Sequence, residues 1–159
     1  MALKKEVVSV YVENTANVLT RVVSLIGRRG FNIDSLTVSA TNDPMLSRIT
    51  IVFEGETLTL QQLIAQIEKL EIVKSVKALD MNKSFFRELL MVKLNADKTQ
   101  RSAIKEIVDI YRAKIINLTR SDMVLELTGS PDKLDAFLDL LECYDIIDIC
   151  RTGITGIEK

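Results

Sequence analysis

One order of secondary-structure patterns, strand–helix–strand–strand–helix–strand, occurs twice along the 159 residues of this chain. Residues 7–79 carry the first copy and residues 89–149 carry the second. The strand patterns are short runs rich in β-branched residues, and the helix patterns repeat apolar residues every three or four positions. A βαββαβ unit of this kind folds into an antiparallel sheet with both helices on one face. The repeat therefore predicts an α+β chain made of two ferredoxin-like βαββαβ units.

The first copy has clear signals at the ends of its elements. Gly30 stands where the first helix should end and suits the left-handed conformation of that position. Thr59 and Gln62 match a capping box that would begin the second helix. Asn42-Asp43-Pro44 is typical of a turn between two strands. The expected strands are residues 7–12, 32–41, 47–54 and 72–79, and the apolar helix faces span residues 18–26 and 60–70.

The second copy follows a polar stretch, residues 80–84, which we interpret as a domain boundary. Ser130-Pro131-Asp132 suits the N-cap and first turn of a helix. The expected strands are residues 89–94, 114–118, 123–128 and 144–149, and the apolar helix faces span residues 104–111 and 134–141. We therefore predict two domains, residues 1–80 and 84–159, with residues 152–156 forming a mobile tail.

The composition argues against catalysis and against a nucleic-acid partner. The chain has no histidine, which removes the usual general base and the commonest metal ligand. The acidic residues form no recognisable acid–base pair, and no phosphate-binding motif is present. A formal net charge of -1 and a pI of about 5.6 give no attraction for a polyanion. We expect no catalytic residue, no metal site and no nucleic-acid partner in this chain.

RNA-recognition domains share the predicted architecture, but they stack bases on aromatic residues of the central strands. The equivalent strands here offer only Tyr11 and Phe53. Phe53 is in register with the apolar residues of its strand, so we expect it in the core. This pattern does not favour RNA binding.

The chain carries no sign of export or membrane insertion. Residues 1–6 are charged where a signal peptide needs an apolar segment, and no apolar run approaches the ~18–20 residues of a membrane span. Cys143 and Cys150 lie close enough in the sequence for a disulfide, but without a secretory context we expect buried free thiols instead. We expect a cytoplasmic protein with no membrane partner.

The segment from Val12 to Leu19 is polar and small although it joins an apolar strand to an apolar helix. Free backbone N–H groups at a helix N-terminus could hold the carboxylate of an amino acid. Asn32, from the same chain or from a second one, could accept a hydrogen bond from the ammonium group. The residues alone favour a plain turn over a ligand site, with Asn14 or Asn17 capping the helix.

Units of about 75 residues bury little surface alone. The edge strands of their sheets also offer unpaired backbone groups to another chain. We therefore expect a homodimer.

Three segments of the first unit, Val10–Asn14, Val18–Val22 and Arg29–Val38, resemble the N-terminal ACT domain of the regulatory (small) subunit of acetohydroxyacid synthase, also called acetolactate synthase. Four further segments resemble the same family: Asp43–Thr50, Arg87–Leu94, Lys133–Phe137 and Arg151–Gly156. The similarity extends over nearly the whole chain, so it is more specific than a general likeness to ACT domains.

The resemblance implies a non-catalytic chain of branched-chain amino acid biosynthesis. Such subunits dimerise and activate a catalytic subunit, and that subunit carries the thiamine diphosphate, Mg²⁺ and FAD, so this chain is expected to hold no cofactor. They usually confer feedback inhibition by valine, sometimes by leucine or isoleucine. The resemblance places the effector between two ACT domains, residues 1–80 of each chain. Matched by motif, the effector-binding residues are Asn14, Thr15, Ala16, Asn17, Val18 and Leu19 of one chain with Asn32 and Ile33 of its partner.

Asn17 departs from the family pattern, which usually has glycine at this position. Asparagine tolerates positive φ better than most residues, so the loop could keep its shape. Either the Asn17 side chain bonds the effector or caps the helix, with binding retained, or it crowds the effector and weakens the valine response. An alternative function, a free-standing ACT-type amino-acid sensor acting on another target, leaves the matching second unit without a purpose.

Overall fold

The structure is a computed structural model that describes residues 4–55 and 57–159. Residues 1–3, the start of the charged N-terminal segment that is unlike a signal peptide, lie outside the described residues. The chain divides into two compact units. One contains the chain up to Phe85 together with Ile154–Lys159, and the other is Phe86–Gly153.

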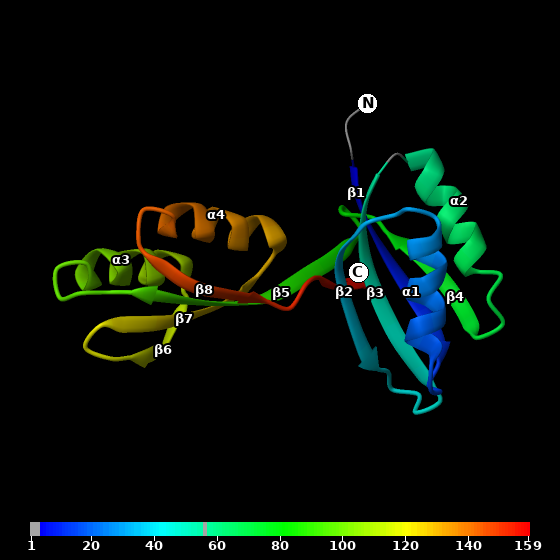
Figure 1. The fold of residues 1–159 in the computed structure, drawn as a ribbon, viewed down its shortest axis with the longest axis horizontal. Coiled ribbons are helices and arrows are strands. Elements are labelled where there is room, and N and C mark those ends of the chain that lie inside the picture. Colours follow the sequence, from blue (N-terminus) through cyan, green and yellow to red (C-terminus); the bar gives the residue numbers. More distant parts are fainter. Residues whose placement is uncertain (1–3, 56) are drawn as a thin grey trace. The chain divides into compact units, whose positions relative to one another are not determined.

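The first unit is a four-stranded antiparallel sheet with two helices on one face (Figure 1). Its strand order is β2-β3-β1-β4, so β2 and β4 are the edges. The elements are β1 (Lys4–Glu13), α1 (Val18–Arg28), β2 (Ile33–Ala40), β3 (Leu46–Gly55), α2 (Thr57–Ile67) and β4 (Val73–Leu79).

Strict alternation along β1 separates the two faces of this sheet. Val8 and Val10 are fully buried and lie opposite Ile51 and Ile49 of β3. Together with the apolar stripes of α1 and α2 they form one core. Phe53, expected in the core, is fully buried. Its ring packs edge-on against the ring of Phe31, with 6.3 Å between the two ring centroids. The intervening residues of β1 point to the face without helices.

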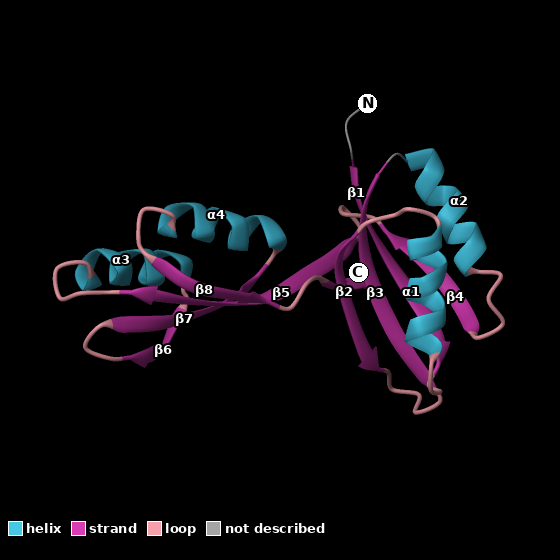
Figure 2. Cartoon of the chain, viewed as in Figure 1, coloured by secondary structure: helices cyan, strands magenta, loops and turns pink. Residues whose placement is uncertain are grey.

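The second unit repeats the arrangement, with α3 and α4 on one face of a sheet in the order β6-β7-β5-β8 (Figure 2). Phe137 of α4 is fully buried and packs on Tyr111 at 5.3 Å between ring centroids. The elements are β5 (Ser84–Asn95), α3 (Arg101–Tyr111), β6 (Lys114–Leu118), β7 (Asp122–Gly129), α4 (Pro131–Leu141) and β8 (Ile146–Arg151). The predicted fold, two ferredoxin-like units, is confirmed.

The last residues of the chain differ from the sequence prediction. The expected mobile tail, residues 152–156, overlaps a strand, β9 (Thr155–Glu158), which pairs with β5. Residues 154–159 also count with the first unit, whereas the sequence placed them in a second domain of residues 84–159. A short polar segment has little strand signal of its own, so its conformation depends on distant partners.

Two smaller predictions were wrong. Helix α2 begins at Thr57, so Thr59 lies within its first turn and is not the N-cap of a capping box. Cys143 and Cys150 are free thiols, as expected, but both are exposed. Cys150 lies on edge strand β8 opposite Met91, a position that no helix covers.

Candidate functional site

The loop between β1 and α1 is held in place by Asn14. Its backbone N–H donates to Met45 O at 2.8 Å, and its side-chain Nδ2 donates to Pro44 O at 3.0 Å. The Asn14 Oδ1 accepts from the Ser47 hydroxyl at 3.1 Å. These bonds fasten the loop to the turn between β2 and β3. Asn14 therefore positions the loop, and its side chain does not cap the helix, which was one reading of the sequence.

Asn17 is the N-cap residue of α1 and has φ 68° and ψ 1°, in the left-handed region. Its side chain makes no capping hydrogen bond, although its carbonyl accepts from Arg21 N at 3.1 Å. The capping role left open by the sequence is thus excluded. The backbone conformation is one that glycine and asparagine adopt more easily than other residues.

The first turn of α1 offers free backbone donors. The N–H groups of Val18, Leu19 and Thr20 make no hydrogen bond with any described residue. They lie at the positive end of the helix dipole, where a carboxylate is favoured. The Val18 side chain is buried beneath the loop, and Leu19 is 40% exposed. Thr15 and Ala16 are exposed on the same loop. This end of α1 can bind a small carboxylate and offers an apolar side chain beside it.

Asn32 and Ile33 lie far from this loop within one chain. Ile33 is opposite Phe53, whereas the loop follows Glu13, which is opposite Leu46 at the other end of β3. The two groups of predicted effector residues are separated by the length of β2, about 24 Å for an antiparallel strand. One chain by itself therefore does not bring them together.

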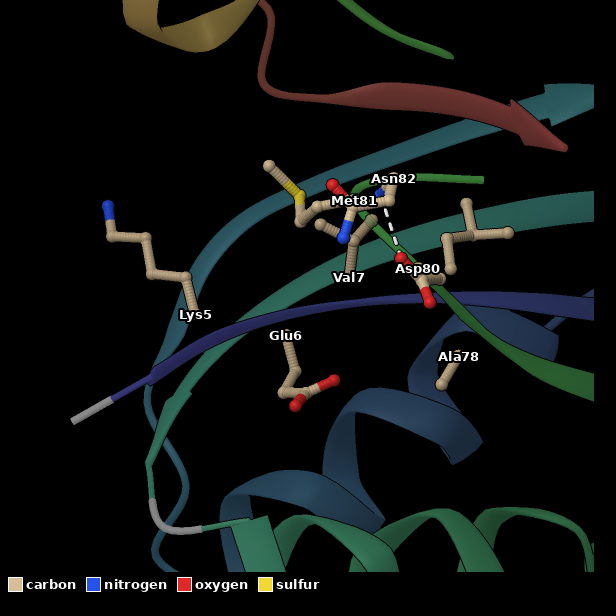
Figure 3. Close-up of a pocket in the computed structure, with 8 residues that line it drawn as sticks. Lys5, Glu6, Val7, Ala78, Asp80, Met81 and Asn82 are labelled. Carbon is tan, nitrogen blue, oxygen red and sulfur yellow. Dashed lines mark hydrogen bonds between the residues drawn. The ribbon is translucent and has the colours of Figure 1, made fainter. Parts of the chain in front are cut away.

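Two cavities lined by described residues contain none of the predicted effector residues. One, of about 390 Å³, lies beside β1 and the end of β4 (Figure 3). Its wall includes Lys5, Glu6 and Asp80, and Asp80 Oδ1 accepts from Asn82 N at 2.7 Å. The other, of about 290 Å³, lies on the face of the first sheet that carries no helices. Sequence reasoning missed both, because each depends on segments far apart in the chain.

Within the described part of the chain, no three His, Cys, Asp or Glu side chains are grouped so that they could hold a metal ion. None of the described helices is long and apolar enough to cross a membrane.

Comparison with known proteins matches both halves of the chain to one family. Residues 87–159 match the family described as the small subunit of acetolactate synthase. Residues 8–75 match the family described as the AHAS small subunit-like ACT domain. The resemblance seen in the sequence is confirmed.

Curated relatives and a crystal structure agree over almost the full length. A probable acetolactate synthase small subunit of Archaeoglobus fulgidus is 41% identical over 150 residues, covering 94% of this chain and 93% of the relative. The Escherichia coli acetolactate synthase isozyme 3 small subunit is 37% identical over 156 residues, and the match covers 98% of this chain and 96% of the relative. The crystal structure of the Thermotoga maritima acetolactate synthase small subunit superposes with a TM-score of 0.89 at 35% identity, covering 98% of each chain.

Proposed function

Since this chain belongs to the family of acetolactate synthase small subunits, which are regulatory and not catalytic, we propose that it binds the catalytic subunit and raises its activity. The reaction would serve branched-chain amino acid biosynthesis. Thiamine diphosphate, Mg²⁺ and FAD belong, in this proposal, to the catalytic subunit. The family matches over both units support the role as a regulatory subunit, because a sensor acting alone would need only the first unit.

The proposed effector is valine, bound between the first units of two copies of this chain. The observation that carries this proposal is the row of free N–H groups at Val18, Leu19 and Thr20. They would receive the valine carboxylate. Edge strand β2 has one side without a partner strand among the described residues. A two-fold pairing of two β2 edges would run antiparallel, and it would bring the partner's Asn32 and Ile33 toward the β1–α1 loop.

Asn17 would make the valine response weaker than glycine would at the same position. Its side chain is exposed and has no hydrogen-bond partner in the described chain, and it lies next to the free donors. A left-handed glycine there would leave more room for the ligand. The proposal is therefore an activating subunit with attenuated feedback inhibition.

The test is reconstitution of the full-length protein with a catalytic subunit, followed by valine titration against acetolactate formation. We expect activation without valine, weak inhibition by valine, and stronger inhibition in the variant Asn17→Gly. Asn82→Gly, in an exposed turn remote from the loop, is the matched control and should leave the inhibition unchanged.

Each part of the proposal has its own contradicting result. If the protein neither binds nor activates the catalytic subunit, the proposed subunit role is refuted. If it binds valine but not the catalytic subunit, the result supports a free-standing sensor instead. Activation with no valine effect at millimolar concentration, in both the wild type and Asn17→Gly, would refute the effector site.

A further inference from the structure

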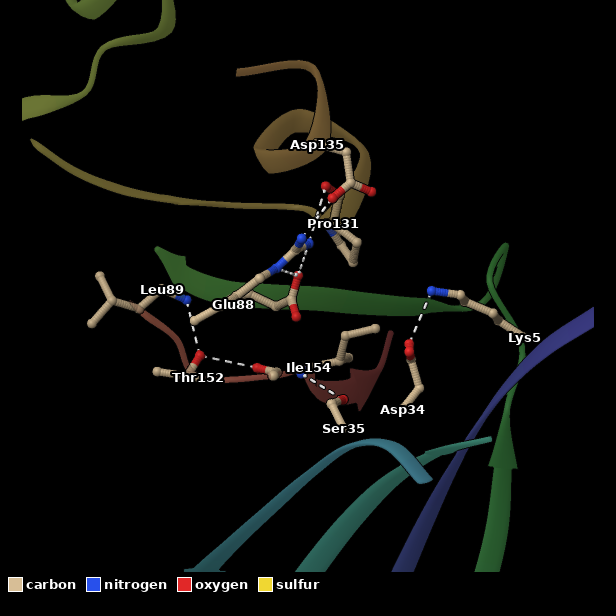
Figure 4. A network of polar contacts seen from close by, with 11 residues as sticks. Lys5, Asp34, Ser35, Glu88, Leu89, Pro131, Asp135, Thr152 and Ile154 are labelled. Atoms are coloured by element: carbon tan, nitrogen blue, oxygen red, sulfur yellow. Dashed lines mark hydrogen bonds and ion pairs between the residues drawn. The ribbon is translucent and has the colours of Figure 1, made fainter. Parts of the chain in front are cut away.

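Residues Ile154–Glu158, here called the C-terminal strap, cross the helix-free face of the first sheet. The strap first meets β2, where Ile154 N donates to Ser35 Oγ at 3.4 Å (Figure 4) and Thr37 Oγ1 donates to Ile154 O at 3.1 Å. It then meets β3, where Arg48 Nη1 donates to Gly156 O at 3.3 Å. At its far end Glu158 pairs with Lys77 of β4. The strap therefore spans the sheet from one edge strand to the other.

The cavity of about 290 Å³ lies between this strap and the sheet. Ser9 and Tyr11 of β1, Arg48 of β3 and Lys77 of β4 line it from the sheet, and Gly156 and Glu158 line it from the strap. The register explains this grouping, because Ser9 is opposite Lys77 and Tyr11 is opposite Arg48. Four polar side chains from three strands thus face one cavity that is partly open to solvent.

Two polar atoms in this cavity wall have no hydrogen-bond partner among the described residues. Ser9 is 2% exposed, and its hydroxyl bonds no described residue. The Nε of half-buried Arg48 is also without a partner in the described chain. A buried donor without a partner is unfavourable, so such atoms are normally satisfied by water or by a ligand.

The charges around the cavity favour an anion. The Arg48 guanidinium bonds a carbonyl and the Tyr11 hydroxyl, and it stacks 4.9 Å from the centroid of the Tyr11 ring. Among the described residues it has no carboxylate partner. Lys77 pairs with Glu158 at 2.7 Å, and this hydrogen bond raises the pKa of Lys77. Arg48 therefore leaves an uncompensated positive charge in the wall.

We propose that the cavity under the C-terminal strap binds a small oxyanion, a carboxylate or a phosphate group, through Arg48, Lys77 and Ser9. This site lies on the face of the sheet opposite α1 and is separate from the proposed valine site. The Glu158 carboxylate competes with the ligand for Lys77. Because Gly156 and Glu158 form the outer wall, binding also holds the strap against the sheet.

Calorimetric titration of the full-length protein with inorganic phosphate, and separately with acetate, tests the proposal at constant ionic strength. Saturable binding of phosphate alone identifies a phosphate group, and saturable binding of acetate alone identifies a carboxylate. Arg48→Gln should weaken binding by about tenfold or more, because it removes a charge-assisted hydrogen bond. Glu158→Gln should tighten binding, since it frees Lys77. Arg28→Gln, at an exposed arginine of α1, is the matched control and should change nothing.

Ser9→Ala separates a binding role from a structural one. It removes a buried hydroxyl that has no partner, so the unliganded protein should keep or gain thermal stability, while anion binding weakens several-fold. If Arg48→Gln fails to fold, Ser9→Ala still tests whether the cavity binds the anion. Absence of saturable binding of either anion, or equal binding by the wild type, Ser9→Ala and Glu158→Gln, would overturn the proposal.

Discussion

Breaking the ion pair between Glu88 and Arg151 should destabilise the second unit more than the loss of any exposed ion pair. Glu88 lies on β5 with a side chain only 4% exposed, and Arg151 ends β8. Arg151 Nε donates to Glu88 Oε2 at 2.9 Å, and Nη2 bonds the same oxygen. A third nitrogen, Nη1, reaches Asp135 of α4 at 2.6 Å, but that carboxylate is 59% exposed. Arg151 thus joins two strands and a helix.

The variant Arg151→Met leaves the Glu88 carboxylate buried without its partner. Removing one member of a fully buried pair costs about 3–5 kcal/mol. Because the Arg151 side chain is 28% exposed, water screens part of this charge, and we expect a loss of about 2–4 kcal/mol. Asp135→Asn removes only the exposed arm and should cost at most about 1 kcal/mol.

Urea unfolding followed by circular dichroism measures both losses in the full-length protein. Amide hydrogen exchange at Leu90 and Val92, in the centre of β5, assigns the loss to the second unit. The double variant Glu88→Leu with Arg151→Met should recover most of the stability, since apolar replacement of both partners removes the buried charge. A loss for Arg151→Met no larger than that for Asp135→Asn, or no recovery in the double variant, would refute this reasoning.

Two further predictions concern a glycine and an aspartate. Gly30→Ala should destabilise the protein by about 1–2 kcal/mol in thermal unfolding, because the residue has a φ of +75°. A steric clash would not contribute, since no described atom beyond the adjacent residues lies within 4 Å of the new Cβ. Gly27 lies inside α1 and has as much room for a Cβ among the described residues, so Gly27→Ala should leave stability unchanged or raise it. An equal loss of stability in both variants would contradict the idea that backbone strain at residue 30 causes the loss. The Thr99 hydroxyl, followed by the backbone N–H groups of Gln100 and Thr99, lowers the pKa of Asp97 from its ordinary 3.8. The ionised Asp97 carboxylate therefore contributes fully to stability above pH 3.8. This contribution is lost as the pH falls through the lower pKa that Asp97 has in the folded state. The Tm difference between wild type and Asp97→Ala should shrink over that range, and a constant difference would contradict the assignment.

Much of the candidate site was predictable from local signals. The position of the β1–α1 loop follows from where a strand pattern ends and a helix pattern begins. The tolerance of Asn17 for positive φ was inferred from its chemistry, and the structure gives it φ 68°. The task of Asn14 was not predictable, because its partners Pro44 and Ser47 lie 30 and 33 positions away.

The two βαββαβ units and their cores are encoded locally, because periods of two and about 3.6 residues are properties of neighbouring positions. The position of the last residues depends instead on contacts made in the folded protein. Ile154 bonds Thr37 across 117 positions and Arg48 bonds Gly156 across 108. No local pattern encodes such pairings, because the bonded groups lie more than 100 positions apart in the sequence. The cavity with Ser9 at its wall depends on these long-range contacts.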